Sequence, residues 1–333
     1  MLPNTLLVVA ASLASALAAS AGCSAALPSG LTPGGPSQNI TVISKSVIGK
    51  TTQRQFLLHL PPNFGAMNDQ PAPVILAFHG QLQPAWSMES VTELSKPAFN
   101  KDYVVVYPQG LAVQSPGIQW LSDPLAPPSS VVDDRIFATE ILDHLTSHFC
   151  IDESRVYATG VSNGGGLTTL LACDAVFNKR IAAFGLVAAA TYPDSSLTEP
   201  LFGKGCQPNI AANRHVPILE FHGLNDSVIA YSGNNGNSPA SIPVAEFVQS
   251  WVTKNRCSGV SPVVKSLEGG TVKETSWSCS GKANVIVHRA IAGFGHGWPG
   301  VAKQADVFER LRLGPTTWNA SKVILEWFGQ HKL

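Results

Sequence analysis

The stretch "YATGVSNGGG", residues 157–166, places three consecutive glycines where a helix is expected to begin. It follows the strand-like run "RVYATG" and precedes a helical pattern that starts near Leu167. Each glycine in a helix costs about 1 kcal/mol relative to alanine. Helix propensity therefore does not explain Gly164, Gly165 and Gly166, and a steric requirement of the turn is the better explanation.

Residues 160–164, "GVSNG", match G-x-S-x-G, the nucleophile elbow in which a strand turns sharply into a helix and presents a serine. The serine backbone is strained there, so Gly160 and Gly164 must be small, and the next two glycines let the helix pack close to the sheet. The helix N-terminus supplies free N–H groups for a developing oxyanion. The pentapeptide also occurs in structural loops, but the strand before it and the helix after it predict that Ser162 is a nucleophile.

A serine nucleophile requires an acid and then a histidine base later in the chain. Of nine histidines, His296 lies in the glycine-rich "AGFGHGWPG", after the last strand-like run. We expect it to be the base, although a loop histidine held by local hydrogen bonds is the alternative. His79 and His222 each end a strand and His288 lies within one, so structural roles are expected for these three.

The acid is predicted from "EFHGLNDSVIAYSG", residues 220–233, where Asp226 follows a strand end between the serine and the histidine. A carboxylate there can accept from the histidine Nδ1–H and fix its tautomer. An Asx-turn is the alternative role, and Asp194 is the rival acid. A histidine base must be neutral, so we expect activity to fall in solutions more acidic than about pH 6 to 7.

Backbone N–H groups are expected to form the oxyanion hole. The loop "FHGQLQPA", residues 78–85, would supply the N–H of Gln81 or Leu82, and the second would come from Asn163. The aromatic residues Trp298, Tyr231 and Trp120, and the irregular insertion 191–215, are candidates for a substrate-binding wall. For Trp120 and Tyr231, ordinary packing in the core is an equally open alternative.

The remaining pattern predicts an α/β fold. Near-continuous apolar runs such as 73–80 and 102–110 suit central parallel strands, and they alternate with helical patterns such as 133–148, which begins after a natural N-cap, Asp133. Residues 39–47 and 54–62 suit an antiparallel edge pair. We predict a single domain with a mostly parallel, doubly wound sheet and helices on both faces.

Composition limits the partners of this chain of 333 residues. Only 13% of residues are charged and the formal net charge is zero, which argues against a nucleic-acid partner. An apolar run from Leu6 to about Leu17, followed by small residues, predicts a signal peptide over 1–21 with cleavage after Ala21, leaving 22–333 as the secreted domain. The run is short for a membrane anchor, and a lipid on Cys23 is the other alternative.

Cysteines and sequons fit secretion. The six cysteines predict three disulfides, and the pairs we favour are Cys257–Cys279, Cys173–Cys206 and Cys23–Cys150. No cysteine or histidine spacing indicates a metal, and no cofactor is expected. Of the three sequons, Asn39 and Asn319 are expected to carry glycans. Asn225 adjoins Asp226, and a glycan there would crowd the site, so we expect it to be unmodified.

Four motifs together resemble one family: "HG" after the strand ending at Phe78, "CIDESRVYATGVSNGG" around Ser162, "FHGLNDSVIAYSG" around Asp226 and "GFGHGWPG" around His296. It is the secreted esterase group of carbohydrate esterase family 1, with fungal feruloyl esterases, acetylxylan esterases and polyhydroxybutyrate-depolymerase-like proteins. The resemblance covers nearly all of the chain after the signal peptide.

This resemblance implies an α/β-hydrolase fold, metal-independent ester hydrolysis and a triad of Ser162, Asp226 and His296. The expected substrates are plant cell-wall polysaccharide esters or small phenolic or acetyl esters, hydrolysed by a monomer that binds neither nucleic acid nor membrane. Release of hydroxycinnamic acids is the favoured activity, with acetylxylan or a short polyester as the alternative substrate. A non-catalytic binding protein is the alternative of another class. The bulky loop 81–84 departs from the small or glycine-rich loop usual in the family.

Overall fold

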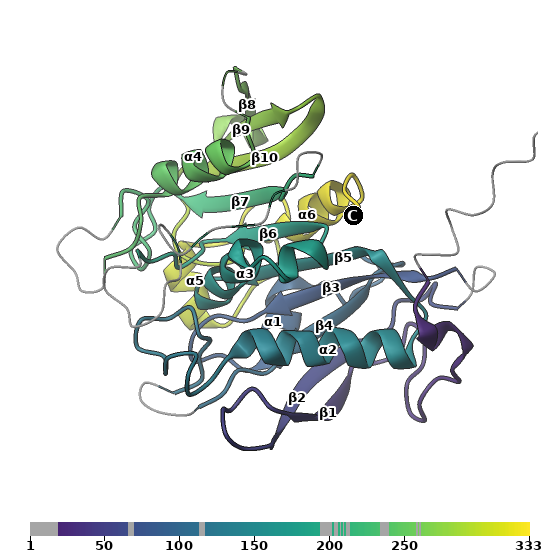
Figure 1. The fold of residues 1–333 in the computed structure, drawn as a ribbon. Helices are drawn as coiled ribbons and strands as arrows, with labels where there is room; N and C mark the ends of the chain where they lie inside the picture. Colours follow the sequence, from purple (N-terminus) through teal and green to yellow (C-terminus); the bar gives the residue numbers. More distant parts are fainter. Residues whose placement is uncertain are drawn as a thin grey trace, which may run out of the picture.

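The structure is a computed structural model that describes residues 19–65, 70–112, 117–193, 202, 206, 208, 210, 214–233, 240–257, 259 and 261–333. It is built on one ten-stranded sheet (Figure 1) with the strand order β1-β2-β4-β3-β5-β6-β7-β10-β9-β8. The strands are β1 (Gln38–Ser44), β2 (Thr52–His59), β3 (Ala72–Phe78), β4 (Val104–Pro108), β5 (Ile151–Val161), β6 (Ala183–Val187), β7 (Ile218–Gly223), β8 (Val263–Leu267), β9 (Val272–Cys279) and β10 (Lys282–Ile291).

The six central strands, β4, β3, β5, β6, β7 and β10, run parallel to one another. The prediction of a mostly parallel sheet is confirmed, since antiparallel pairing is confined to β1 and β2 at one edge and to β9 and β8 at the other. Strands β3, β4, β6 and β7 are buried along their whole length. Helices on both faces explain why their sequences are apolar at nearly every position.

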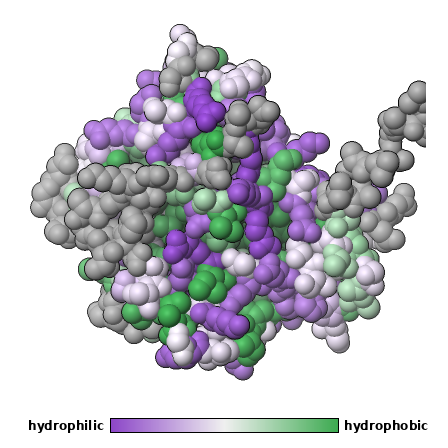
Figure 2. All heavy atoms as spheres, in the orientation of Figure 1, coloured by the Kyte–Doolittle hydropathy of each residue, from purple (hydrophilic) through white to green (hydrophobic). Residues whose placement is uncertain are grey.

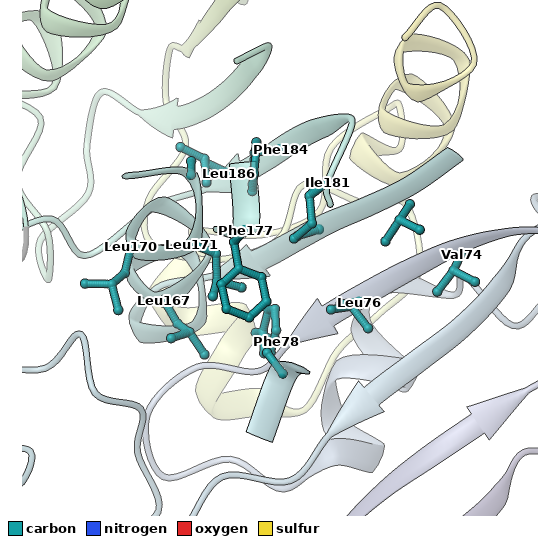
Figure 3. Close-up of a cluster of buried hydrophobic side chains, with 14 of the residues drawn as sticks. Val74, Leu76, Phe78, Leu167, Leu170, Leu171, Phe177, Ile181, Phe184 and Leu186 are labelled. Carbon is teal, nitrogen blue, oxygen red and sulfur yellow. The ribbon is translucent and has the colours of Figure 1, made fainter. Parts of the chain in front are cut away.

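Helices cover the two faces of the sheet (Figure 1): α2 (Asp134–His148), α3 (Asn163–Cys173) and α4 (Val244–Lys254) on one, and α1 (Ala85–Thr92) and α6 (Ala320–Phe328) on the other. Successive residues of β3 divide between these layers, so Val74, Leu76 and Phe78 pack toward α3 (Figure 3) while Ile75 and Ala77 pack toward α6. The N-cap predicted for α2 is confirmed, since the side chain of Asp133 accepts from the N–H of Arg135.

Four elements were not expected from the sequence: α1, β8, β9 and α5 (Asp306–Arg312). Strand β8 is exposed at four of its five positions, so it has no apolar stripe to reveal it. Helices α1 and α5 are only 8 and 7 residues long, too short for a clear helical period. The face seen in Figure 2 carries hydrophilic residues interspersed with hydrophobic ones. Within the described ranges, no helix is long and apolar enough to cross a membrane.

All three expected disulfides are present: Cys23–Cys150, Cys173–Cys206 and Cys257–Cys279. The first attaches the segment 19–24 to the start of β5. Within that segment Ser20 is buried, its N–H donates to Ile151 O at 2.9 Å and its Oγ donates to Phe149 O at 2.7 Å. These contacts involve residues that cleavage after Ala21 would remove.

Candidate active site

The turn between β5 and α3 holds Ser162 in a strained backbone conformation, with φ 55° and ψ −122°. The glycines on either side are sterically required. A Cβ on Gly160 would lie 2.3 Å from the carbonyl oxygen of Gly164, and a Cβ on Gly164 would lie 2.2 Å from that of Phe78. Gly166 likewise approaches Ala190 O, where a Cβ would lie at 2.4 Å. Close contact between the turn, the helix and the sheet therefore explains the run of glycines.

Two backbone N–H groups near Ser162 make no hydrogen bond to a described residue. Asn163 is the first residue of α3, so its N–H has no acceptor within the helix. The Leu82 N–H donates to Ile118 O at 2.7 Å, whereas the Gln81 N–H is free of any such bond. Of the two candidates in this loop, the geometry favours Gln81. Its side chain is turned away, donating to Asp123 Oδ2 at 2.8 Å.

The neutral side chain of His79 holds the loop that contains Gln81 through two hydrogen bonds. His79 Nδ1 donates to Gly80 O at 2.8 Å and its Nε2 accepts from the Gly110 N–H at 3.0 Å. Burial, with a smaller contribution from Arg54, lowers the pKa of His79 to about 4 despite the bond to Gly80 O. A structural role for His79 matches the expectation.

Trp120 was a candidate for the substrate wall, with ordinary packing equally open, and its burial in the structure favours packing. Its side chain is fully buried, its Nε1–H donates to His79 O at 2.8 Å and its backbone N–H donates to Asn163 Oδ1 at 2.8 Å. The indole therefore joins the oxyanion loop to the start of α3. It has no exposed surface on which a substrate could lie.

Asp226 and His296 form a buried pair. His296 Nδ1 donates to Asp226 Oδ2 at 2.8 Å across 70 residues of sequence. The other oxygen, Oδ1, accepts from the backbone N–H groups of Val228 and Ile229, each at 2.8 Å. Burial alone would raise the pKa of the Asp226 carboxyl, but contacts with His222 and His296 outweigh it and hold that pKa far below its usual range. The carboxylate is therefore ionised, and it accepts hydrogen bonds from the N–H groups of Val228, Ile229 and His296.

The loop that carries His296 is anchored to α5 through backbone and guanidinium contacts. The His296 N–H donates to Leu311 O at 2.7 Å, and Gly295 N–H donates to Arg312 O at 3.0 Å. The buried Arg312 side chain donates to the carbonyl oxygens of Gly300 and Ala302, each at 2.9 Å. An unexpected helix therefore fixes the position of the predicted base.

Ser162 and His296 line one small cavity, of about 30 Å³, between α1 and α5. Its other lining residues include Trp298 and the polar Gln83 and Gln304, together with an apolar wall formed by Val91, Val161, Phe308 and Leu311. Larger hollows of about 180 to 220 Å³ lie elsewhere among the described residues, and none of them is lined by Ser162 or His296.

Of the other two expected wall aromatics, only Trp298 reaches this cavity, and its Nε1–H donates to Ser321 Oγ at 3.0 Å. Tyr231 does not line it; the Tyr231 hydroxyl instead bonds to His288 Nε2 at 2.8 Å. Asp194, the rival acid, and most of the insertion 191–215 lie outside the described residues.

Sequence reasoning missed Glu220. This carboxylate is buried in β7, 2.9 Å from His222 Nδ1 and 2.5 Å from His288 Nδ1. The signal available was a lone glutamate in an apolar strand, "VPILEFHG", two residues before a histidine on the same face.

Comparison with characterised proteins places the chain near esterases. It is 28% identical over 212 residues, 62% of this chain, to feruloyl esterase B of Piromyces equi. It is 27% identical over 242 residues, 72% of this chain, to a bifunctional acetylxylan esterase/xylanase of Neocallimastix patriciarum. A poly(3-hydroxyalkanoate) depolymerase of Paucimonas lemoignei is 26% identical over 74% of this chain and 58% of its own. The chain spans 36% and 30% of the length of the first two relatives.

The fold is shared with solved esterase structures. An acetyl xylan esterase from Aspergillus awamori superimposes with a TM-score of 0.57 at 15% identity, over 89% of this chain and all of that one. The single sheet with helices on both faces is an α/β-hydrolase fold, as predicted. No model of a known protein family matches the chain.

Proposed function

We propose that this chain is a serine carboxylic-ester hydrolase in which Ser162, His296 and Asp226 form the catalytic triad. The observation that carries the proposal is the cavity shared by Ser162, at a strained elbow, and His296, whose Nδ1 is bonded to a buried, ionised Asp226. A nucleophile beside a base that is oriented by a third group is the arrangement that acyl transfer requires.

The reaction proceeds in two steps. His296 Nε2 takes the Ser162 hydroxyl proton as Oγ attacks the ester carbonyl, and the N–H groups of Gln81 and Asn163 donate to the oxyanion. The protonated histidine then gives its proton to the departing alcohol, leaving an acyl-serine. Water, deprotonated by His296, attacks that acyl group; the acyl–Oγ bond then breaks, the acid is released and His296 returns its proton to Ser162 Oγ. Asp226 stays ionised throughout and stabilises the imidazolium formed in each step.

The favoured substrate is a feruloyl ester of plant cell-wall arabinoxylan, and similarity to the Piromyces equi feruloyl esterase supports this choice. Acetylated xylan is the second candidate, favoured by the relative named as an acetylxylan esterase, and a short polyester is the third, favoured by the depolymerase. The three disulfides and the leader-like first residues support a secreted enzyme, which acts as a monomer.

The test measures kcat/KM for methyl ferulate and for p-nitrophenyl acetate, with Ser162→Ala as the control. We expect ferulate turnover, and a loss of at least about three powers of ten in kcat in the variant. Acetate turnover without ferulate turnover would keep the triad and move the substrate to an acetylated or short-chain polymer. A loss below about tenfold in Ser162→Ala would refute the assigned nucleophile.

Labelling with a fluorophosphonate separates an active serine hydrolase from a binding protein on the same fold. We expect the wild-type chain to be modified at Ser162 and the Ser162→Ala variant to remain unmodified. A wild-type chain that resists the reagent and turns over neither ester would instead be the non-catalytic binding protein.

A further inference from the structure

Two titratable side chains are buried side by side in β7 behind the proposed triad. Glu220 and His222 are each 1% exposed and lie on the same face of the strand, two residues apart. Buried charged groups are rare and costly unless they are paired. The triad chemistry described above uses neither side chain, so their presence in a core strand calls for another role.

Hydrogen-bond geometry defines the charge of His222. Its Nδ1 lies 2.9 Å from the carboxylate of Glu220, and its Nε2 lies 2.8 Å from the carbonyl oxygen of Ile229. Burial raises the pKa of Glu220, but contacts with His288 and His222 outweigh it and lower that pKa, so Glu220 is a carboxylate. A carboxylate and a carbonyl only accept, so both ring nitrogens are donors and His222 is an imidazolium. Burial opposes this charge, but contacts with Asp226 and Glu220 outweigh it and raise the pKa of His222 to about 10.

This imidazolium faces the triad acid. His222 Nε2 lies 3.4 Å from Asp226 Oδ2, the oxygen that accepts from His296. Ile229 links the two groups as well, since its N–H donates to Asp226 Oδ1 while its carbonyl accepts from His222. His222 thus places a positive charge beside the carboxylate and holds the turn that wraps around it.

The other groups facing the pair come from three elements. His288 on β10 places its Nδ1 2.5 Å from Glu220 Oε2, and Tyr231 bonds to the far nitrogen of His288. Asp226 and His296, from the loops after β7 and β10, complete the set. Glu220 therefore bridges two histidines and is the only carboxylate other than Asp226 in contact with His222 among the described residues.

We propose that Glu220 and His222 are positioning residues for the reaction: together they keep Asp226 ionised and its Oδ2 directed at His296 Nδ1. Glu220 orients His222, and His222, which Asp226 also keeps charged, acts through Asp226. Neither touches the substrate. This inference rests on the proposed triad.

The two members carry opposite charges, which makes their variants distinguishable. Glu220→Gln removes a negative charge near His296, so the acid limb of the kcat/KM profile should move to lower pH. His222→Gln removes a positive charge, so the limb should move to higher pH. Shifts of about one unit are expected, with kcat lowered about tenfold and KM changed less than about twofold.

His59→Gln is the matched control, because His59 is another buried strand histidine, in β2 and away from the cavity. We expect its acid limb to coincide with that of the wild type. Limbs of Glu220→Gln and His222→Gln that stay in place, or that both move in one direction, would show that the pair is merely structural.

The rate of fluorophosphonate labelling at each pH repeats the experiment without an ester substrate. A wild-type chain that is not labelled refutes the proposed function. If the chain is labelled but the acid limb of the labelling rate lies at the same pH in both variants as in the wild type, only the positioning role of Glu220 and His222 is refuted. If a variant fails to fold, nitrogen NMR of the wild-type histidines decides. We expect the His222 ring to remain doubly protonated at pH 8, and a neutral ring there overturns the proposal.

A second inference concerns the N-terminus. The Ser20 hydroxyl donates to Phe149 O and accepts from the Ile151 N–H at 2.9 Å, and Ala19 forms a bridge with Asp152. Processing after Ala21 would remove these residues. It would leave the Ile151 N–H and Phe149 O without partners in a buried region.

We infer that the leader is removed after Ala18, so that the mature chain begins at Ala19. Signal peptidase prefers the pattern A-x-A before the cleaved bond, and Ala16-Leu17-Ala18 satisfies it as well as Ala19-Ser20-Ala21 does. Mass spectrometry of the N-terminal peptide of protein secreted with its own leader should identify Ala19 as the first residue. A chain beginning at Gly22, or one that keeps its leader, refutes the inference.

Serine variants test the stabilising role of this segment. Ser20→Ala should lower Tm, because it removes one donor and one acceptor from a buried site. Ser24→Ala is the matched control, since the Ser24 hydroxyl makes one exposed bond within the same segment. Equal Tm values for the two variants would show that the buried contacts of Ser20 contribute nothing to stability.

Discussion

The turn that holds Ser162 and the two loops that hold Asp226 and His296 meet near one cavity but are stabilised by different physical means. The turn depends on backbone contacts so close that a Cβ on Gly160 or Gly164 would lie under 2.5 Å from a backbone oxygen. The loops depend on buried charges and hydrogen bonds between strands β7 and β10. Steric fit positions Ser162, the proposed nucleophile, and electrostatics position Asp226 and His296, the proposed acid and base.

The largest expected effect is the loss of activity when the buried carboxylate of Asp226 is replaced. Asp226→Asn should lower kcat by about ten-thousandfold, because an amide can donate to His296 Nδ1 and so favour the wrong tautomer. Steady-state kinetics on p-nitrophenyl acetate measures this. Asp306→Asn, at a carboxylate that is 79% exposed on α5, is the matched control and should keep wild-type activity. A tenfold loss or less in Asp226→Asn would remove Asp226 from the triad.

Substitutions at the glycines of the turn around Ser162 should lower the free energy of unfolding. Gly164→Ala places a methyl group 2.2 Å from Phe78 O, so the turn or β3 must move, at a cost of at least about 3 kcal/mol. Denaturant unfolding monitored by circular dichroism measures it. Gly329→Ala is the control, because the nearest atoms to its new methyl group lie 3.6 Å away. Equal stability of the two variants would contradict the steric account of the elbow.

The charge on His222 makes part of the stability depend on pH. Its folded-state pKa is raised to about 10 from an ordinary value of about 6.5, so its stabilisation is complete below about pH 6.5 and is lost as the pH rises toward 10. The Tm difference between wild type and His222→Gln should narrow across that range. A His222 difference that is constant from pH 6 to 10 would argue for a neutral ring.

The smallest expected effects concern glycans. Asn39 is exposed on the edge strand β1, so peptide mapping should find it modified, and Asn39→Gln should leave kcat unchanged. Asn319 is half-buried and its Oδ1 accepts from the Val301 N–H, yet modification is still expected there. Asn225 should be unmodified, because its Oδ1 accepts from the Gly293 N–H between the two loops of the pair. Sugar found at Asn225 would count against Asp226 as the acid.

Features that depend on neighbouring residues were predictable from the sequence, and features that depend on burial and distant contacts were not. The elbow, the parallel strands and the helix after Asp133 were predictable because each depends on neighbouring residues and on period. Strands β8 and β9 were missed, since β8 packs almost no side chain inward. The role of Trp120 stayed open because burial, not residue type, decides whether an indole can meet a substrate.

The elbow at Ser162, the proposed nucleophile, was predictable from the sequence, because the glycines and the serine are contiguous and their spacing specifies one turn. The sequence also determined the class of fold, because apolar runs and helical periods alternate along the chain. The contact of His296 with Asp226 across 70 residues, and the place of Glu220 and His222 behind them, follow from the tertiary structure alone. The charges of these groups depend on burial and on partners from other strands, and no local pattern of residues contains that information.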